Sequence, residues 1–324
     1  MENQFENRID LTKLVSKTQE IKNEISKYIV GQQQLIDLLL IALLADGHVL
    51  IEGVPGVAKT LTAKLLAKTI DTEFKRIQFT PDLMPSDIIG TSIFNAKTSD
   101  FEFKKGPLFA NIVLTDEINR SPAKTQAALF EAMEERQITV DGKTYPLDLP
   151  FMVLATQNPI EQEGTYRLPE AQLDRFLFKI HVSYPSLEDE SKMLMNFHNN
   201  SHIIDLNTIN KIISKTEINE FKKLITKIVI EENLINYITQ IVNATRKNSG
   251  LYLGASPRAS IAILNSAKAN ACIQNRDFVT PDDIKFVAFP VLRHRVIITP
   301  EKEMEGVQVD SIIQQIIDKV EVPR

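Results

Sequence analysis

After a short apolar run, His48-Val49-Leu50-Ile51, the chain reads Gly53-Val54-Pro55-Gly56-Val57-Ala58-Lys59-Thr60. Glycines flank the run, which predicts a strand, and residues 59–69 have the periodicity of a helix. A glycine-rich loop between a strand and the start of a helix is the setting in which backbone N–H groups bind phosphates. We therefore predict a phosphate-binding loop over residues 53–60.

Two side chains at the end of this loop are candidates for nucleotide chemistry. Lys59 is expected to bind the outer phosphates, and the Thr60 hydroxyl is expected to take one coordination position on Mg²⁺. The motif as usually written has glycine where this chain has Ala58. A residue about to enter a helix needs little positive φ, so we expect Ala58 to be a mild departure. The agreement of strand, Lys-Thr pair and helix disfavours a chance glycine-rich turn.

Two adjacent carboxylates follow a second apolar run, Ile112 to Thr115. Asp116 is expected to hold Mg²⁺, directly or through water. Glu117 is expected to orient and polarise the water that attacks the γ-phosphate. The alternative is that both acids only cap the next helix. The presence of Lys59 and Thr60 in the same chain favours the metal and water roles.

A third polar group follows the apolar run Phe151 to Thr156, which ends in Gln157-Asn158-Pro159. Open α/β sheets bind ligands at the carboxyl ends of their strands, so Asn158 is a candidate to hold the attacking water or the γ-phosphate. Asn-Pro alone is more often a turn initiator. The order of the three motifs along the chain favours the binding role.

Strand and helix patterns alternate over residues 1–185, with further strand candidates at 74–79 and 176–182. This alternation predicts an α/β domain with a parallel sheet covered by helices on both faces. Amphipathic helices without strand signals then follow, and predict a smaller all-α domain over residues 186–324. Two segments interrupt the alternation, at residues about 88–109 and about 136–147. In the second of them Asp141-Gly142 predicts a tight hairpin turn.

Composition limits the classes of protein to consider. Hydrophobic residues make up 43% of the 324 residues and charged residues 24%, as in folded globular proteins. The net charge of -5 argues against a protein that mainly coats nucleic acid. The charged N-terminal stretch and the single Cys272 favour a reducing cytoplasm. The most apolar stretch, residues 35–44, is too short to span a membrane and predicts a buried helix.

Three segments together resemble a MoxR-type AAA+ ATPase: residues 52–60, residues 115–120 (Thr-Asp-Glu-Ile-Asn-Arg) and residues 168–176 (Leu-Pro-Glu-Ala-Gln-Leu-Asp-Arg-Phe). Ala58 is common in that family. Gly254-Ala255-Ser256-Pro257-Arg258 resembles the second sensor of the family, with Arg258 at the start of a lid helix. Residues 88–109 and 136–147 match the helix-2 insert and the pre-sensor hairpin of the wider group.

The resemblance implies ATP hydrolysis with Mg²⁺, a ring of six subunits, and a chaperone-like role in maturing or remodelling other proteins. Family members often work with proteins that carry a von Willebrand factor A domain. Ile29 and Val30 lie where relatives pack the adenine ring. The resemblance names neither the client protein nor the process served.

An AAA+ site needs a cation from the neighbouring subunit, which stabilises charge on the phosphoryl group in transfer. Arg175 is the first candidate for this arginine finger, with Arg120 and Arg167 as lesser candidates. An isolated arginine is more often part of a surface salt bridge. Whether Arg258 serves the nucleotide of its own subunit or that of a neighbour is left open.

Two further patterns receive structural interpretations. The five histidines lack the spacing of metal ligands, and the basic cluster Arg293-His294-Arg295 is predicted to be a solvated lid surface. Thr280-Pro281-Asp282-Asp283 predicts the start of a helix.

Three other functions compete with the chaperone-like ATPase. A nucleic-acid motor would grip DNA with the 136–147 hairpin, but the tip Asp141-Gly142-Lys143 offers one cation and one acid. A magnesium-chelatase-like subunit would share the same core and differ only in its partner. A non-hydrolysing, ATP-dependent scaffold has only Ala58 in its favour, because the groups needed for phosphoryl transfer are all present.

Overall fold

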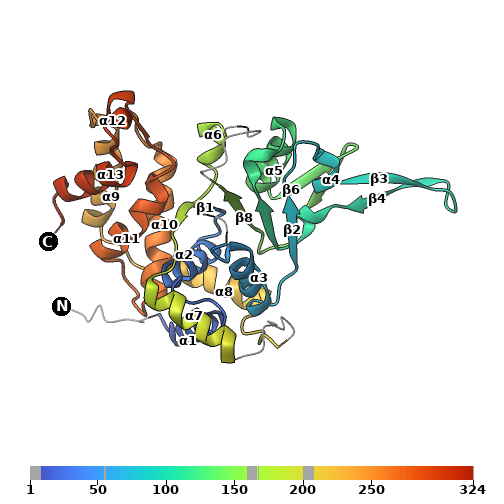
Figure 1. The fold of residues 1–324 in the computed structure, drawn as a ribbon, viewed down its shortest axis with the longest axis horizontal. Helices are drawn as coiled ribbons and strands as arrows, with labels where there is room; N and C mark the ends of the chain where they lie inside the picture. The colour runs from blue at the N-terminus through green and yellow to red at the C-terminus, as the bar shows by residue number, and fades with distance from the viewer. Residues whose placement is uncertain (1–8, 55, 159–165, 167, 200–207, 324) are drawn as a thin grey trace, which may run out of the picture.

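A computed structural model describes residues 9–54, 56–158, 166, 168–199 and 208–323 of the chain. Its α/β part contains a five-stranded sheet with the order β2-β5-β8-β1-β9, and every neighbouring pair is parallel (Figure 1). These strands are β1 (Val49–Gly53), β2 (Phe74–Gln78), β5 (Ile112–Asp116), β8 (Met152–Gln157) and β9 (Phe178–Val182). The predicted parallel sheet is confirmed.

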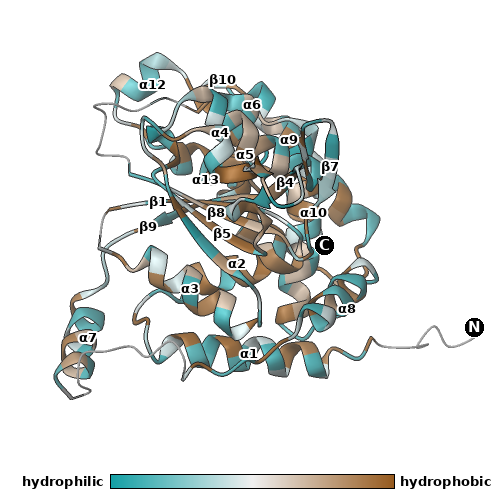
Figure 2. Cartoon of the chain, turned by 90° about the vertical axis from the view of Figure 1, so that its right-hand side faces the viewer, coloured by the Kyte–Doolittle hydropathy of each residue, from teal (hydrophilic) through white to brown (hydrophobic). Residues whose placement is uncertain are grey.

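Helices cover both faces of this sheet. One face packs against α1 (Thr12–Ser26), α2 (Gln33–Leu44) and α3 (Lys59–Thr69), and the other packs against α4 (Pro85–Ile89) and α5 (Ala123–Glu135). Figure 2 shows the apolar strands β5 and β8 between these two layers. Alternate residues of one strand face opposite layers: Ile51 joins the first core and Leu50 the second. As predicted, α2 is buried along most of its length.

The second part of the chain is helical, and Figure 1 shows it as the yellow to red helices beside the sheet. It comprises α7 (Leu187–Asn199), α8 (Lys215–Thr226), α9 (Glu232–Lys247), α10 (Pro257–Ile273), α11 (Pro281–Leu292), α12 (Pro300–Met304) and α13 (Val309–Lys319). Apolar residues of α8 and α10 share one core with α2, so burial is continuous between the two parts. The domain boundary near Ser186 stays a prediction. None of the described helices is long and apolar enough to cross a membrane.

The absence of strands after residue 185 was predicted wrongly. Strand β10 (Leu251–Leu253) pairs antiparallel with β11 (Ile297–Ile298) in the helical part. Strands of three and two residues are too short to show an alternating pattern, so the sequence gives no signal for them.

Both interruptions of the α/β alternation contain antiparallel hairpins. The first is formed by β3 (Gly90–Asn95) and β4 (Asp100–Lys105), and it projects from the body of the molecule (Figure 1). It is followed by a short 3₁₀ turn, Pro107–Phe109. The second pairs β6 (Gln137–Val140) with β7 (Lys143–Pro146), with positive φ at the predicted turn, 51° at Asp141 and 73° at Gly142. The Ser92 hydroxyl donates to the Asp141 carboxylate at 2.6 Å, which ties the two hairpins together.

The prediction that residues 293–295 form a solvated surface is wrong. His294 is 7% exposed and Arg295 is 8% exposed. Arg293 donates to both carboxylate oxygens of Asp310 and to the carbonyl of Lys179. A charged group can be buried when its donors all find acceptors, and here those acceptors come from segments distant in sequence. The helix start at Thr280 is confirmed, since α11 begins at Pro281.

His48 is a buried, neutral histidine at the start of β1. Its Nδ1 accepts from the backbone N–H of Val153 at 2.9 Å, and its Nε2 lies 3.1 Å from the carbonyl of Met133. Burial, helped by the nearby charge of Arg136, lowers the pKa of His48 from 6.5 to about 3. The unfolded chain therefore takes up a proton at this residue at a higher pH than the folded chain does.

We expect His48 to make the fold sensitive to acid. Its contribution to the free energy of unfolding is complete above the unfolded pKa of 6.5 and is lost as the pH falls toward about 3. Urea unfolding at about pH 7 and about pH 5 should show a smaller loss of stability in His48→Gln than in the parent, because glutamine does not titrate. An equal loss in both proteins would contradict this account of His48.

Candidate functional site

The glycine-rich loop connects β1 to α3 as predicted, and Pro55 within it lies outside the described residues. Gly53 packs so closely against β9 that a Cβ there would lie 2.5 Å from the carbonyl oxygen of Val182. Gly56 has a φ of 86°, and a Cβ at that position would meet nothing within 4 Å, so the space beside the loop is open. Val54 is partly buried, and Val57 is buried.

The expectation for Ala58 is wrong. Ala58 is the N-cap of α3 and has a φ of 59° and a ψ of 21°, in the left-handed region. Glycine adopts this conformation at lower cost, because a Cβ crowds the backbone there. The loop therefore carries local strain at Ala58 that the usual glycine would avoid.

Lys59 lies close to the carboxylates that follow β5. Its Nζ donates to the carbonyl of Gly53 at 2.7 Å, so the side chain folds back over the loop. Burial lowers the pKa of Lys59, and the charges of Asp116, Glu117 and Glu52 oppose that shift. Thr60 follows in the first turn of α3, where backbone N–H groups have no partner within the helix. The loop and the acids thus form one site.

Asp116 and Glu117 are held by groups from the neighbouring strands β2 and β8. Asp116 is 7% exposed; one carboxylate oxygen accepts from Arg76 Nε at 2.6 Å and the other from the Thr156 hydroxyl at 3.0 Å. The Thr156 hydroxyl also accepts from the backbone N–H of Glu117 at 3.0 Å. Glu117 itself has a φ of 57°, which directs the chain away from the strand at that residue.

The Glu117 carboxylate has two partners of its own. One of its oxygens accepts from Gln78 Nε2 at 2.9 Å and lies 3.2 Å from Arg120 Nε. Arg120 is therefore an ion-pair partner of Glu117 within its own chain. Sequence analysis missed Arg76 and Gln78. Both are polar and flank Ile77, a period-2 signal that predicts a strand with these two side chains on one face. The structure pairs this strand with β5.

Asn158 directly follows β8, which lies between β5 and β1 in the sheet. It therefore follows the carboxyl end of its strand, as predicted, and the strand order places it between the Asp116 strand and the loop strand. Its role toward water or phosphate stays a prediction. Ile29 is buried in the core after α1, and Val30 is partly exposed beside it. The role of these two residues toward a base stays a prediction.

Arg175 and Arg258 lie together at a different place. Arg175 follows α6 (Glu170–Leu173), and its NH1 donates to the carbonyl of Phe130 at 2.6 Å. Its Nε lies 3.8 Å from one carboxylate oxygen of Glu134, and Arg258 donates to the other oxygen at 3.0 Å. Glu134 on α5 therefore pairs with both arginines. Arg167 lies outside the described residues.

The two groups of residues lie at opposite ends of the parallel strands, one at their carboxyl ends and the other at their amino ends. The loop and Asn158 follow the carboxyl ends of β1 and β8, and Asp116 is the last residue of β5. The end of α5, where Glu134 lies, contacts the amino edge, because Met133 is bonded to His48 at the start of β1. A five-residue strand spans about 17 Å. The structure thus does not bring Arg175 or Arg258 to the glycine-rich loop of its own chain.

Comparisons with known proteins show the family to which the chain belongs. Residues 48–178 match the model of the ATPase family associated with various cellular activities (AAA), and residues 243–316 match an AAA lid domain. The chain is 48% identical over 314 residues to YeaC, an uncharacterised protein of Bacillus subtilis (strain 168), covering 97% of this chain and 96% of that one. It is 42% identical over 310 residues to Chaperone MoxR1 of Mycobacterium tuberculosis, covering 93% and 81%.

A solved structure supports the same conclusion. The crystal structure of a candidate ATPase from Cytophaga hutchinsonii has a TM-score of 0.89 with this chain at 48% sequence identity, covering 96% of this chain and 97% of that one. Fold and site together define an AAA-type ATPase module followed by a helical lid. The chain belongs to the MoxR family of AAA+ ATPases.

Proposed function

We propose that this chain hydrolyses ATP to ADP and phosphate and uses the reaction to remodel or mature partner proteins. The observation that carries the proposal is the convergence of Lys59, Asp116 and Glu117 at one edge of the sheet. A cation for the phosphates, a carboxylate for a metal and a carboxylate for water are the parts that phosphoryl transfer requires. The chaperone-like use rests on the family and on the name of the relative Chaperone MoxR1.

The residues at this edge fit ATP and Mg²⁺. Mg²⁺ prefers oxygen ligands, and the Thr60 hydroxyl and the Asp116 carboxylate supply them. Among the described residues each Asp116 oxygen accepts one hydrogen bond, and a carboxylate oxygen has two lone pairs, so acceptor capacity remains. The open space at Gly56 leaves room for phosphates beside the loop. Bound there, Mg²⁺ would neutralise charge on the phosphates, while Lys59 and the loop N–H groups hold them in line with the water on Glu117.

The remaining positive charge comes from a neighbouring subunit in this proposal. Arg175 and Arg258 lie at the amino edge, about one strand length from their own loop. A ring of identical subunits, six in the family pattern, would bring these arginines to the loop of the next subunit. We therefore assign both to action in trans, and Arg120, which pairs with Glu117 of its own chain, is the weaker finger candidate.

The partners are protein clients, and proteins with a von Willebrand factor A domain are the first to test because of the family resemblance. A nucleic-acid motor is disfavoured, since the acid at the tip of the β6–β7 hairpin is tied to Ser92 and would repel phosphate. ATPase activity that rises with single-stranded DNA and falls with salt would favour the motor instead. A magnesium-chelatase-like subunit would be distinguished by its partner.

Replacing Lys59 by alanine should abolish tight binding of ATP. The loop backbone remains in this variant, but the phosphates lose their principal side-chain cation. Lys68→Ala is the matched control, because Lys68 is an exposed cation in the last turn of the same helix. A nucleotide titration should show lost affinity in Lys59→Ala and parental affinity in Lys68→Ala. Equal affinity in both variants would contradict the assignment of the loop.

A further inference from the structure

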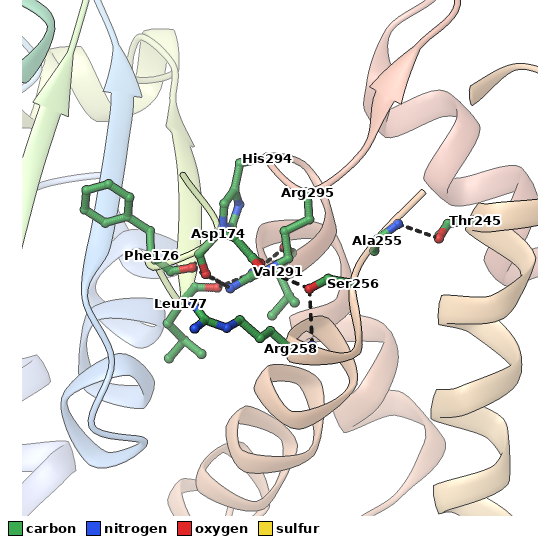
Figure 3. Close-up of polar contacts among 10 residues, drawn as sticks. All are labelled: Asp174, Phe176, Leu177, Thr245, Ala255, Ser256, Arg258, Val291, His294 and Arg295. Atoms are coloured by element: carbon green, nitrogen blue, oxygen red, sulfur yellow. Dashed lines mark hydrogen bonds and ion pairs between the residues drawn. The ribbon is translucent and has the colours of Figure 1, made fainter. Parts of the chain in front are cut away.

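Arg295, from the basic cluster that follows α11, uses every donor of its guanidinium group. Nε donates to a carboxylate oxygen of Asp174 at 2.6 Å. NH1 donates to the carbonyls of Leu177 at 3.1 Å and Val291 at 2.6 Å, and NH2 donates to those of Asp174 at 3.1 Å and Phe176 at 2.6 Å. An arginine has five N–H donors, so none is left over. Three of the four acceptor residues belong to the segment 174–177 that contains Arg175 (Figure 3).

Asp174 connects the same segment to the helix that begins at Arg258. One of its carboxylate oxygens accepts from Arg295 and the other from the Ser256 hydroxyl at 3.0 Å. Ser256 is the N-cap of α10, and its hydroxyl accepts from the backbone N–H of Arg258 at 3.2 Å (Figure 3). His294 adds a further contact to the carbonyl of Phe176 at 2.9 Å. Both candidate trans-acting arginines are thus attached to one polar junction between the lid and the α/β part.

We propose that Asp174 and Arg295 are positioning residues for the arginine finger. Arg295, a lid residue, holds the backbone carbonyls on both sides of Arg175, so the place of the Arg175 guanidinium depends on the position of the lid. This inference rests on the proposed function, because it matters only if Arg175 completes the site of a neighbouring subunit. It adds that the position of the lid in one subunit determines the rate of hydrolysis in the next, because it determines where Arg175 lies.

The physical basis is the short range over which a finger works. A displacement of about 1 Å in a catalytic group lowers a rate about 10²-fold. The segment 174–177 connects α6 to β9, and its N–H groups donate to backbone carbonyls of α6 and, from Leu177, to that of His48. Arg295 and His294 of the lid bond to the carbonyls of the same segment, and a buried charge with all its donors paired has one preferred geometry.

The test compares two carboxylates that each hold a lid arginine. Asp174→Asn weakens the hold of Arg295 on the finger segment, since an amide has one acceptor oxygen where the carboxylate has two. Asp310→Asn does the same to Arg293, which holds the lid to β9 through Lys179 and, within the described part of the chain, has no hydrogen bond or ion pair with residues 174–177. We expect kcat for ATP to fall about 10²-fold in Asp174→Asn at parental nucleotide affinity, and to stay parental in Asp310→Asn.

Mixing two kinds of variant subunit in one ring distinguishes a positioning role from a general loss of stability, because an unstable subunit would not restore ATPase activity. Rings that combine Asp174→Asn with Glu117→Gln subunits should regain activity, because some sites then join an intact Glu117 to a well-placed Arg175. The double variant Asp174→Asn/Arg175→Ala should be no slower than Arg175→Ala alone. If Asp174→Asn does not fold, Ser256→Ala, which removes one bond to Asp174, should lower kcat in the same way and be rescued in the same mixture.

The outcomes separate this inference from the proposed function. Parental kcat in folded Asp174→Asn and Ser256→Ala, with Arg175→Ala inactive, would overturn the positioning role and leave the finger in place. A loss in Asp310→Asn equal to that in Asp174→Asn would also overturn it, because loosening the lid would then be sufficient. Full activity in Arg175→Ala would remove the finger itself, and no hydrolysis by the parent protein would remove the proposed function.

Discussion

A Glu117→Gln variant should bind ATP as tightly as the parent and hydrolyse it about 10²- to 10⁴-fold more slowly. Glutamine keeps the shape of the side chain and can keep a hydrogen bond with Gln78, so the loop and the Asp116 site stay intact. Only the negative charge that polarises the attacking water is removed. Binding and turnover are therefore expected to separate in this variant.

The measurement pairs a nucleotide titration with steady-state ATPase kinetics. Glu73→Gln is the control. Glu73 is an exposed acid just before β2, so it lies at the amino ends of the strands, away from the loop at their carboxyl ends. It should leave both quantities at parental values. Turnover at the parental rate in Glu117→Gln would show that Glu117 does not activate the water.

Arg175→Ala should nearly silence hydrolysis and spare nucleotide affinity. In other phosphoryl-transfer systems a finger contributes about 10³ to 10⁵ in rate. Affinity is spared because Arg175 lies at the amino edge with Phe130 and Glu134, away from the loop of its own chain. The variant also loses the bond to Phe130, so thermal unfolding should be measured alongside kcat. Unchanged kcat in a folded Arg175→Ala ring would exclude Arg175 as the finger.

The elements that the sequence predicted are those with a strong local signal. Continuous apolar runs identified β1, β5 and β8 because both faces of a central parallel strand are buried. Asp141-Gly142 identified the turn of the β6–β7 hairpin because such pairs readily adopt positive φ. The phosphate loop and the two acids were recognisable because each follows such a strand directly.

What the sequence did not predict depends on contacts between distant segments. Arginine is usually a surface residue. Arg295 can be buried because the carbonyls of residues 174–177 accept its N–H groups. Arg76 reaches Asp116 because β2 pairs with β5, a neighbour relation that no local pattern encodes. The positive φ of Ala58 follows from the geometry of the loop, which residue type alone does not reveal.

The separation of the site into two groups is the most consequential of these features. Lys59, Asp116 and Glu117 meet at one edge of the sheet, while Arg175 and Arg258 meet on Glu134 at the other. Spacing along the chain cannot distinguish this arrangement from a single site. Under the proposed function, this arrangement means that a complete site requires two subunits.

Mixing two inactive variants tests this claim most directly. Pure rings of Glu117→Gln lack a water-activating carboxylate at every site, and pure rings of Arg175→Ala lack a finger at every site. In mixed rings, some interfaces join an intact Glu117 to an intact Arg175 of the neighbour, so ATPase activity should reappear. Activity per protein in the parent should also fall on dilution as rings dissociate. Absence of any recovery in verified mixed rings, or full activity in a verified monomer, would contradict a site shared between subunits.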